Sequence, residues 1–506
     1  MEYIISKRND NIFCENKKIS YIDSLNEQKL SLRSKKISKI ISKKRIKILE
    51  QSKTINNDLL KKEHRIQIKK FSSSFNEIIS YLKSNDDNLI SYILDLLNEY
   101  FKLNEPDIEE QKLIIEGQFL EILLDLGLSF IKCKNEYDLE KILLIFMNIQ
   151  IYNEGNNSYL NILYSEKFLE FTNYCFTQTD SDEIMNEIII LLYYTIKINN
   201  EIIFKILQSK IIESIINFAL NKSQDLDTIE SIIKLIVNCL TIPQNYELNA
   251  KEINIINKLF LILKKGLSQI ENEKIQKLCY EGFYYLTKIN NKYGYIEKII
   301  KENIYIEILK IKSRYPLLNA LTTLSNILTE SDEILEQINL EDIICFYNKV
   351  LNLYDNDDKL VYIVLHGLVN ISDSEHINVI ESSIIWEKEK IQKYFNKNEN
   401  IQILFIKIIK YMIRSGNNKA LKFIYKTKIL EYLIFLSANA ECNEKIRIKI
   451  FKLIDNYLKR FKSEEKESAE YLIILNKFKD LISLLSDAIN IKDEIIECIK
   501  EQYKLI

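Results

Sequence analysis

The chain almost lacks the two residues that most often interrupt helices. Its 506 residues include 8 glycines and 3 prolines, where average usage of roughly 12% would give about 60. Phosphate-binding loops, doubly wound sheets and β-sandwiches all need glycine at their turns. The shortage therefore argues against those folds and predicts long helices joined by short polar connectors.

A repeating unit of about 40–45 residues begins near Phe75. Each unit has a polar opening, a long apolar helix, a short connector rich in Asn, Lys and Ser, and a second apolar helix, as in 182–220. One unit cannot bury its apolar faces alone, so neighbouring units must stack into an α-solenoid. The expected units are 74–128, 129–178, 180–222, 223–266, 267–312, 313–353, 354–396, 397–437 and 438–506.

A period of this length fits armadillo or HEAT units better than shorter helical repeats. We therefore predict an all-α, right-handed armadillo-repeat α-solenoid of about 9–10 repeats. The solenoid is expected to cover residues 71–506, and a basic arm is expected to cover residues 1–70.

The arm differs from the rest of the chain in charge. Residues 1–70 hold 19 Lys and Arg against 8 Asp and Glu, whereas the remaining residues hold 51 against 64. Leu30, Ile37 and Ile41 return to one helical face within its most basic stretch. The arm is expected to be either a basic amphipathic helix or a partly disordered tail. It can meet an acidic partner or fold back on the acidic body.

No pattern of catalytic or metal-binding residues is visible. The eight cysteines include no CxxC pair, the three histidines cannot form a large metal site, and no Ser–His–Asp, G-x-S-x-G or Walker pattern occurs. The scattered cysteines are expected to be buried apolar residues. No secretory signal or membrane-spanning run is apparent, so we expect a soluble protein in a reducing compartment, with no cofactor, metal or enzymatic activity.

Four stretches together resemble the importin-α family of nuclear import adaptors. They are LRSKKISKIISKKRIKIL (32–49), EPDIEEQKLIIEGQFLEILLDLG (105–127), NALTTLSNILTESD (319–332) and the closing segment 475–503. The resemblance covers nearly the whole chain, and the order and spacing of the stretches carry it. It implies an importin-β-binding arm followed by armadillo repeats whose concave groove binds basic nuclear localisation signals.

The resemblance also implies a set of groove residues. In that family a Trp and, four residues later, an Asn recur on the third helix of successive repeats. The Trp holds lysine stems by packing and cation–π attraction, and the Asn binds the peptide backbone. Here the places map to Asn148, Asn238, Tyr285, Asn326, His366 and Asn370, with His366 at a Trp place. The other Trp places hold Leu144, Lys234, Glu281 and Thr322. In the third repeat the Trp and Asn places hold Leu191 and Thr195, and in the eighth they hold Ile408 and Met412, so these two repeats keep neither residue.

We therefore expect an adaptor that binds importin-β and basic cargo signals and shuttles between cytoplasm and nucleus. An export factor and nucleoporins are further implied partners, without direct nucleic-acid binding or membrane insertion. The binding and autoinhibitory residues of the arm are expected to be Arg33, Lys35, Lys36, Lys39, Lys43, Lys44 and Arg45. The single tryptophan, Trp386, is expected to be a packing residue.

Two other interpretations stay open. The missing tryptophans also suit an armadillo scaffold that has lost signal binding. The arm could alternatively bind nucleic acid or an anionic membrane, and that binding would depend steeply on salt.

Overall fold

The computed structural model describes most of the repeat region. The described residues are 71–104, 106–116, 118–152, 165–179, 181–198, 202–221, 225–268, 271–289, 291–374, 376–415, 418–438, 442–464, 473–474, 476–477 and 479–480. The basic arm lies outside these residues, so its expected structure and its seven binding residues remain predictions.

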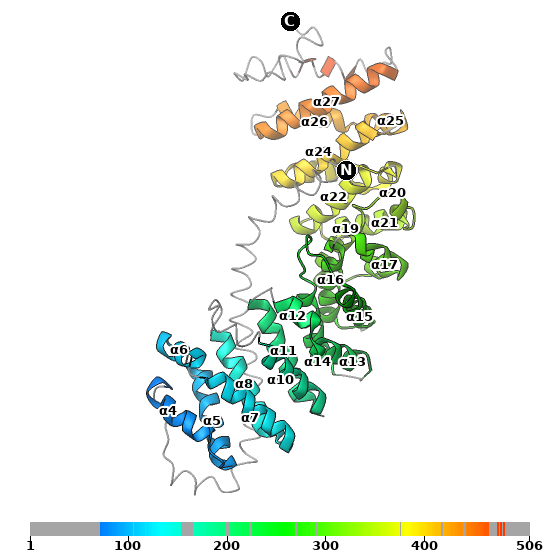
Figure 1. The fold of residues 1–506 in the computed structure, drawn as a ribbon. Helices are drawn as coiled ribbons and strands as arrows, with labels where there is room; N and C mark the ends of the chain where they lie inside the picture. Colours follow the sequence, from blue (N-terminus) through cyan, green and yellow to red (C-terminus); the bar gives the residue numbers. More distant parts are fainter. Residues whose placement is uncertain are drawn as a thin grey trace. The chain divides into compact units, whose positions relative to one another are not determined.

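Within these ranges every element is an α-helix or a short 3-10 helix (Figure 1). Nine helices close the successive repeats, and each packs against the next one along the chain. We call them the third-helix row. They are α5 (Asp87–Leu103), α8 (Glu136–Tyr152), α11 (Asp182–Ile198), α14 (Leu226–Cys239), α16 (Glu273–Lys288), α19 (Arg314–Ile327), α22 (Asp358–Ser372), α24 (Glu399–Ser415) and α27 (Glu444–Glu464).

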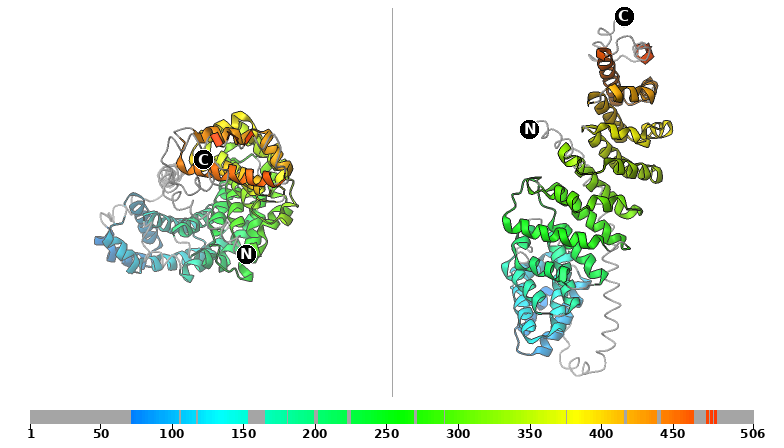
Figure 2. Two further views of the ribbon diagram at one scale, coloured as in Figure 1. Left: turned by 90° about the horizontal axis from the view of Figure 1, so that it is seen from above. Right: turned by 90° about the vertical axis from the view of Figure 1, so that its right-hand side faces the viewer.

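The other helices lie between successive members of the row, except α4, which precedes α5. In Figure 2 the helices follow one another in chain order as successive layers, from cyan through green to orange. The joining α-helices are α4 (Phe71–Leu82), α6 (Ile108–Glu116), α7 (Phe119–Cys133), α10 (Glu166–Gln178), α12 (Ile202–Gln208), α13 (Lys210–Asn221), α15 (Ala250–Leu267), α17 (Tyr295–Lys301), α18 (Ile304–Leu309), α20 (Asp332–Leu335), α21 (Leu340–Leu353), α23 (Lys388–Phe395), α25 (Asn418–Lys426) and α26 (Ile429–Ala438). Three 3-10 helices complete them: η1 (Asn291–Tyr293), η2 (Ile377–Ser382) and η3 (Ile384–Trp386).

The polar connectors start helices by capping them. The Asp86 carboxylate accepts hydrogen bonds from the first backbone N–H groups of α5, and the Asn272 side chain does the same for α16. Asn249 and Glu252 form a reciprocal capping box at the start of α15. Such caps satisfy backbone donors that the first turn of a helix leaves unpaired. The Asn-rich connectors of the sequence are therefore helix-start signals.

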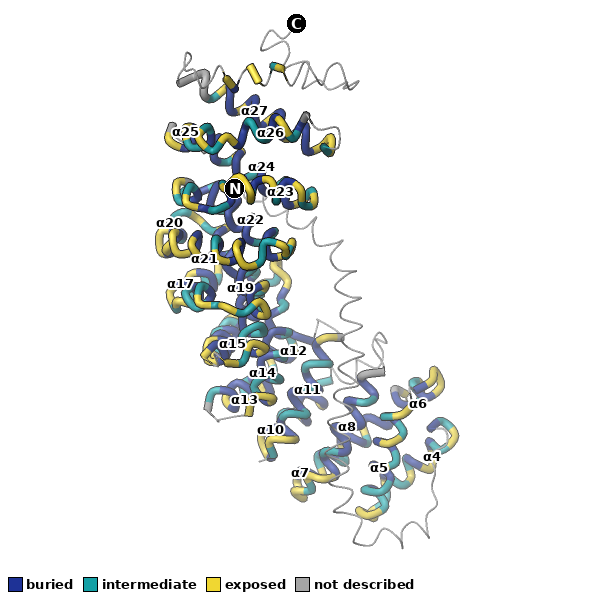
Figure 3. Tube along the Cα trace, turned by 180° about the vertical axis from the view of Figure 1, so that it is seen from behind, coloured by how far each residue is buried: buried dark blue, intermediate teal, exposed yellow. Residues whose placement is uncertain are grey.

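The core is a continuous layer of Ile, Leu and Phe between the rows of helices. In Figure 3 the buried segments face the interior of the stack, and exposed segments cluster at the turns.

Close packing requires a glycine at one position on α22: a Cβ at Gly367 would lie 2.3 Å from the Tyr347 hydroxyl of α21. Tyr347 is fully buried, so no larger residue fits at position 367 without moving that ring.

The repeat period is as predicted, but the phase of the predicted units differs. The unit starts at 313, 354 and 397 fall just before α19, α22 and α24, so each predicted unit begins with the last helix of a repeat. The first unit boundary, 128–129, is wrong, because it lies inside α7. The short opening helices explain the difference. α20 has four residues and α12 has seven, too few to show a helical period.

Candidate functional site

The four predicted asparagines lie at one place on four members of the third-helix row. Each is half-buried, and each side-chain Nδ2 donates a hydrogen bond to the preceding helix of the row. We call them the asparagine row. The pairs are Asn148 to Asn98 Oδ1 at 3.0 Å, Asn238 to the Tyr193 carbonyl at 3.5 Å, Asn326 to Thr287 Oγ1 at 2.8 Å, and Asn370 to the Ser325 carbonyl at 3.0 Å.

These hydrogen bonds hold the four amides in a fixed orientation. Within the described residues no protein donor reaches Oδ1 of Asn148, Asn238, Asn326 or Asn370. A half-buried amide oxygen of this kind can accept an N–H group from a ligand. The row therefore presents the same kind of acceptor on α8, α14, α19 and α22.

Tyr285 and His366 also lie on the row and are half-buried. Burial raises the pKa of Tyr285 to about 12, with a smaller contribution from the nearby Glu281. His366 Nδ1 is 2.9 Å from the Ser325 hydroxyl, and the carbonyl of the same serine accepts from Asn370. The two seventh-repeat residues therefore share one partner on α19.

The predicted places in the third and eighth repeats are wrong by one residue. Leu191, Thr195, Ile408 and Met412 are fully buried, so they cannot face a ligand. The hydrogen bonds show the correct position. Asn370 bonds to the carbonyl of Ser325, the residue before Asn326, and Asn238 bonds in the same way to Tyr193, the residue before Tyr194.

Half-buried residues one position earlier occupy these places on α11 and α24. They are Ile190 with Tyr194, and Lys407 with Tyr411. On α27 the corresponding four-residue spacing is met by Lys452 and Asn456, both exposed. The asparagine places of the third and eighth repeats are therefore occupied by half-buried tyrosines, Tyr194 and Tyr411.

Apart from that of His366, the Trp places named from the sequence carry no aromatic side chain. Leu144 is buried, Lys234 forms an ion pair with Glu230 at 2.6 Å, and the Thr322 hydroxyl bonds to its own helix. Glu281 lies 3.5 Å from the Nδ2 of Asn319. The ion pair of Lys234 with Glu230 removes much of the repulsion that an unpaired lysine would exert on a basic peptide.

Trp386 lies in η3, away from the row, and is half-buried. Its Nε1 donates to the Ile380 carbonyl at 2.9 Å, and its ring meets Phe405 and Phe423 edge-on at centroid distances of 5.9 and 5.6 Å. These contacts confirm that it is a packing residue.

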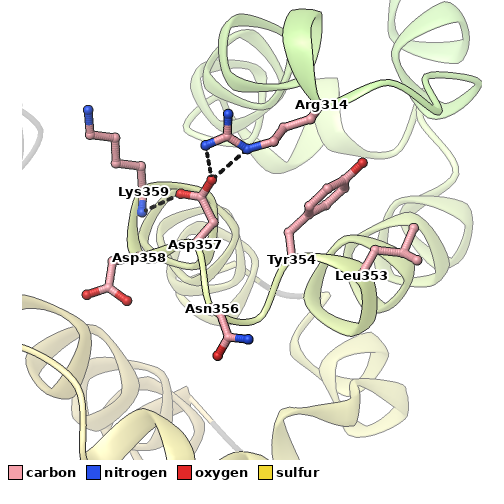
Figure 4. A pocket seen from close by; sticks show the side chains of 7 residues that line it. All are labelled: Arg314, Leu353, Tyr354, Asn356, Asp357, Asp358 and Lys359. Carbon is pink, nitrogen blue, oxygen red and sulfur yellow. Dashed lines mark hydrogen bonds and ion pairs between the residues drawn. The ribbon is translucent and has the colours of Figure 1, made fainter.

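A shallow hollow of about 680 Å³ lies at the turn between α21 and α22. Figure 4 shows the Asp357 carboxylate between Arg314 and the start of α22. Asp357 caps α22 and pairs with Arg314 of the preceding repeat. The hollow is therefore a structural joint between repeats.

The described cysteines differ in burial, and Cys442 is half-buried. Cys175, Cys239 and Cys279 are buried, as predicted, and burial raises the pKa of Cys239 to about 12. Cys133 and Cys345 are exposed, contrary to the prediction. The described residues hold no group of three or more potential metal ligands. Among the described helices, none is both long enough and apolar enough to cross a bilayer.

Comparison with known proteins establishes the fold. No family model and no curated protein matches the chain. A solved chain from a study of the phosphorylation switch that controls the interaction between cadherin and beta-catenin has a TM-score of 0.53 at 11% identity, covering 86% of this chain and 94% of that chain. Armadillo repeat proteins designed computationally for modular peptide recognition match with a TM-score of 0.37 at 14% identity, covering 57% and 99%.

The predicted fold class is therefore confirmed: the protein is an all-α, armadillo-like repeat solenoid. Identity of 11% shows the fold alone, so the function must be argued from the third-helix row.

Proposed function

We propose that the protein is a nuclear import adaptor. It holds an extended basic signal peptide along the third-helix row, binds importin-β through its N-terminal arm, and shuttles between cytoplasm and nucleus. The observation that carries the proposal is the asparagine row, Asn148, Asn238, Asn326 and Asn370. Anchored amides that recur at the same place in four of the repeats suit the backbone of an extended peptide.

Charge on the first helices of the row supports a basic ligand. α5, α8 and α11 each carry three acidic residues and one lysine, and α14 carries two and one. An acidic surplus attracts a cationic peptide and speeds its association. The missing tryptophans remove cation–π contacts that are worth about 0.5–2 kcal/mol each. Binding should therefore be weaker than in an adaptor with an intact aromatic array.

The arm is the second part of the proposal. Its basic cluster, Lys43, Lys44 and Arg45, would compete for the same acidic helices until importin-β binds the arm. A tethered competitor acts at a high effective concentration, so it can block a weak ligand. Release of the arm by importin-β would then open the row to cargo.

The test uses fluorescence anisotropy of a labelled ten-residue Lys/Arg-rich peptide with the full chain. The triple variant of the arm cluster (Lys43, Lys44 and Arg45 to Ala) should bind the peptide more tightly than the unmodified chain. Adding Asn238→Ala to that variant should weaken binding about fivefold, since one hydrogen bond is worth about 1 kcal/mol. Asn257→Ala is the matched control, because Asn257 lies on α15 and bonds only Lys298. Failure of the arm variant to bind any basic peptide at micromolar concentration would contradict the adaptor function.

A second function is favoured by one observation. The row has no tryptophan at its Trp places, and the only tryptophan lies in η3, away from the row. An armadillo scaffold for other proteins would need no such array. In that case the arm would not bind importin-β, and a pull-down of the full chain with importin-β separates the two functions.

A further inference from the structure

The charge of the third-helix row reverses along its length. The first three members, α5, α8 and α11, each carry three acidic residues and one lysine. By contrast, α24 carries one acidic and three basic residues, and α27 carries three acidic and seven basic residues. The two ends of one continuous row therefore favour ligands of opposite charge.

The basic residues of α24 and α27 are arranged as stripes. Lys407 and Lys410 lie three residues apart on α24, and Lys445, Lys449 and Lys452 lie at intervals of four and three on α27. Such intervals place side chains on one helix face. All of these lysines are exposed except Lys407, which is half-buried. We call these five residues the lysine end.

The two helices that carry the lysine end are neighbours. α24 packs against α27, and the Arg460 guanidinium of α27 donates to the Arg414 carbonyl of α24. The lysines also continue the row. Lys407 and Lys452 lie four residues before Tyr411 and Asn456, as His366 lies four residues before Asn370. The lysine end thus extends the same row of side chains that carries the asparagines.

None of the five lysines has an acidic partner within the described residues. Two lysines nearer the acidic end of the row do have acidic partners: Lys141 pairs with Asp95 and Asp138, and Lys234 pairs with Glu230. Lysines at intervals of three and four repel one another and weaken their helix. Among the described residues, the positive charge of the lysine end is therefore not neutralised by an ion pair.

We propose that the lysine end binds an acidic, extended peptide segment of a partner protein. Carboxylate side chains would neutralise the lysines, while the polar side chains of Asn370, Tyr411 and Asn456 continue the hydrogen-bonding positions that suit a peptide backbone. A single-stranded nucleic acid fits less well, because such sites rely on successive aromatic platforms, and Tyr411 is the one aromatic residue among these positions.

The test measures binding of a labelled ten-residue Glu-rich peptide to the full chain by fluorescence anisotropy at two salt concentrations. The double variant Lys449→Glu, Lys452→Glu should lose about tenfold or more in affinity, because two attractive charges become repulsive. Its matched control is Lys132→Glu, Lys301→Glu, which makes the same charge change on the exposed surfaces of α7 and α17. The control should stay within about twofold of the unmodified chain, and thermal melts should show that both variants fold.

Three results would overturn the inference: no binding of the acidic peptide, equal losses in the double variant and its control, or tighter and variant-sensitive binding of a 20-nucleotide single strand. The last result would assign the surface to nucleic acid. Binding of the basic peptide should be unchanged by Lys449→Glu, Lys452→Glu. The proposal for the lysine end and the proposed binding of a basic peptide can therefore be refuted independently.

Discussion

A buried lysine links the first two members of the third-helix row and gives a sharp test of the packing. Lys141 Nζ on α8 lies 2.9 Å from Asp95 Oδ2, 3.0 Å from Asp138 Oδ1 and 2.8 Å from the Ser91 hydroxyl. The side chains of Lys141 and Asp138 are each 5% exposed, while that of Asp95 is 53% exposed. Asp138 is therefore the carboxylate that depends most on the lysine.

Replacing the lysine by Met keeps its apolar stem and removes its charge. The Asp138 carboxylate then stays buried and keeps only the hydrogen bonds from the Ser91 hydroxyl at 2.6 Å and from Asn135 at 2.8 Å. Breaking a buried pair by removing one partner typically costs about 3–5 kcal/mol. We expect Lys141→Met to fall near the lower end, about 3 kcal/mol, because these two hydrogen bonds remain.

The second substitution, Asp138→Asn, removes the stranded charge and keeps the side-chain shape. The double variant should recover most of the loss, since neutralising both partners is far less costly than neutralising one. Urea unfolding followed by far-UV circular dichroism gives the free energies, and amide exchange in α5 and α8 shows whether the loss is local to this joint. A loss below about 1 kcal/mol in Lys141→Met, or a double variant whose loss equals the sum of the two single losses, would refute the reasoning.

Two further predictions concern the later repeats. Gly367→Ala should destabilise the protein by about 1–3 kcal/mol, because the new Cβ would lie 2.3 Å from the Tyr347 hydroxyl, and Tyr347→Phe should reduce that loss in thermal melts. Equal losses in both backgrounds would contradict a clash with the hydroxyl and assign it to the ring carbons Cζ and Cε2 of Tyr347, which would lie 2.8 and 2.9 Å from the new Cβ. Hydrogen bonds from Lys393 and Lys390 hold the pKa of Asp355 below its ordinary value, so their stabilisation is present at neutral pH and lost as pH falls through that lowered pKa. Lys393→Met should therefore be less stable than the unmodified chain at pH 7 and equally stable near pH 2, and a pH-independent difference would contradict this origin.

The repeat architecture could be predicted from the sequence because two features indicate the same fold. The scarcity of glycine and proline excludes folds rich in tight turns, and the apolar helices recur at a steady period. The phase of the repeats was not readable. The opening helix of the seventh repeat, α20, spans four residues, Asp332–Leu335, which is about one turn and shows no periodicity.

The candidate site was readable where the residue type itself marks the position. Asn148, Asn238 and Asn370 stand out in apolar helices because a partly buried amide needs hydrogen-bond partners. Tyr194 and Tyr411 could not be placed, because a one-residue shift around a helix changes a half-buried position into a core position. Only the packing of each helix against its neighbours fixes that rotation.

The bonds of the asparagine row all run in one direction. Each amide belongs to the later helix and reaches back to the earlier one, as Asn370 reaches Ser325 and Asn238 reaches Tyr193. A chain shortened from its C-terminal end would keep every remaining amide satisfied, whereas one shortened from the opposite end would leave its first amide without an acceptor. The four helices α8, α14, α19 and α22 therefore each supply the amide that fastens them to the preceding helix of the row, so loss of a later repeat leaves the amides of the earlier ones bonded.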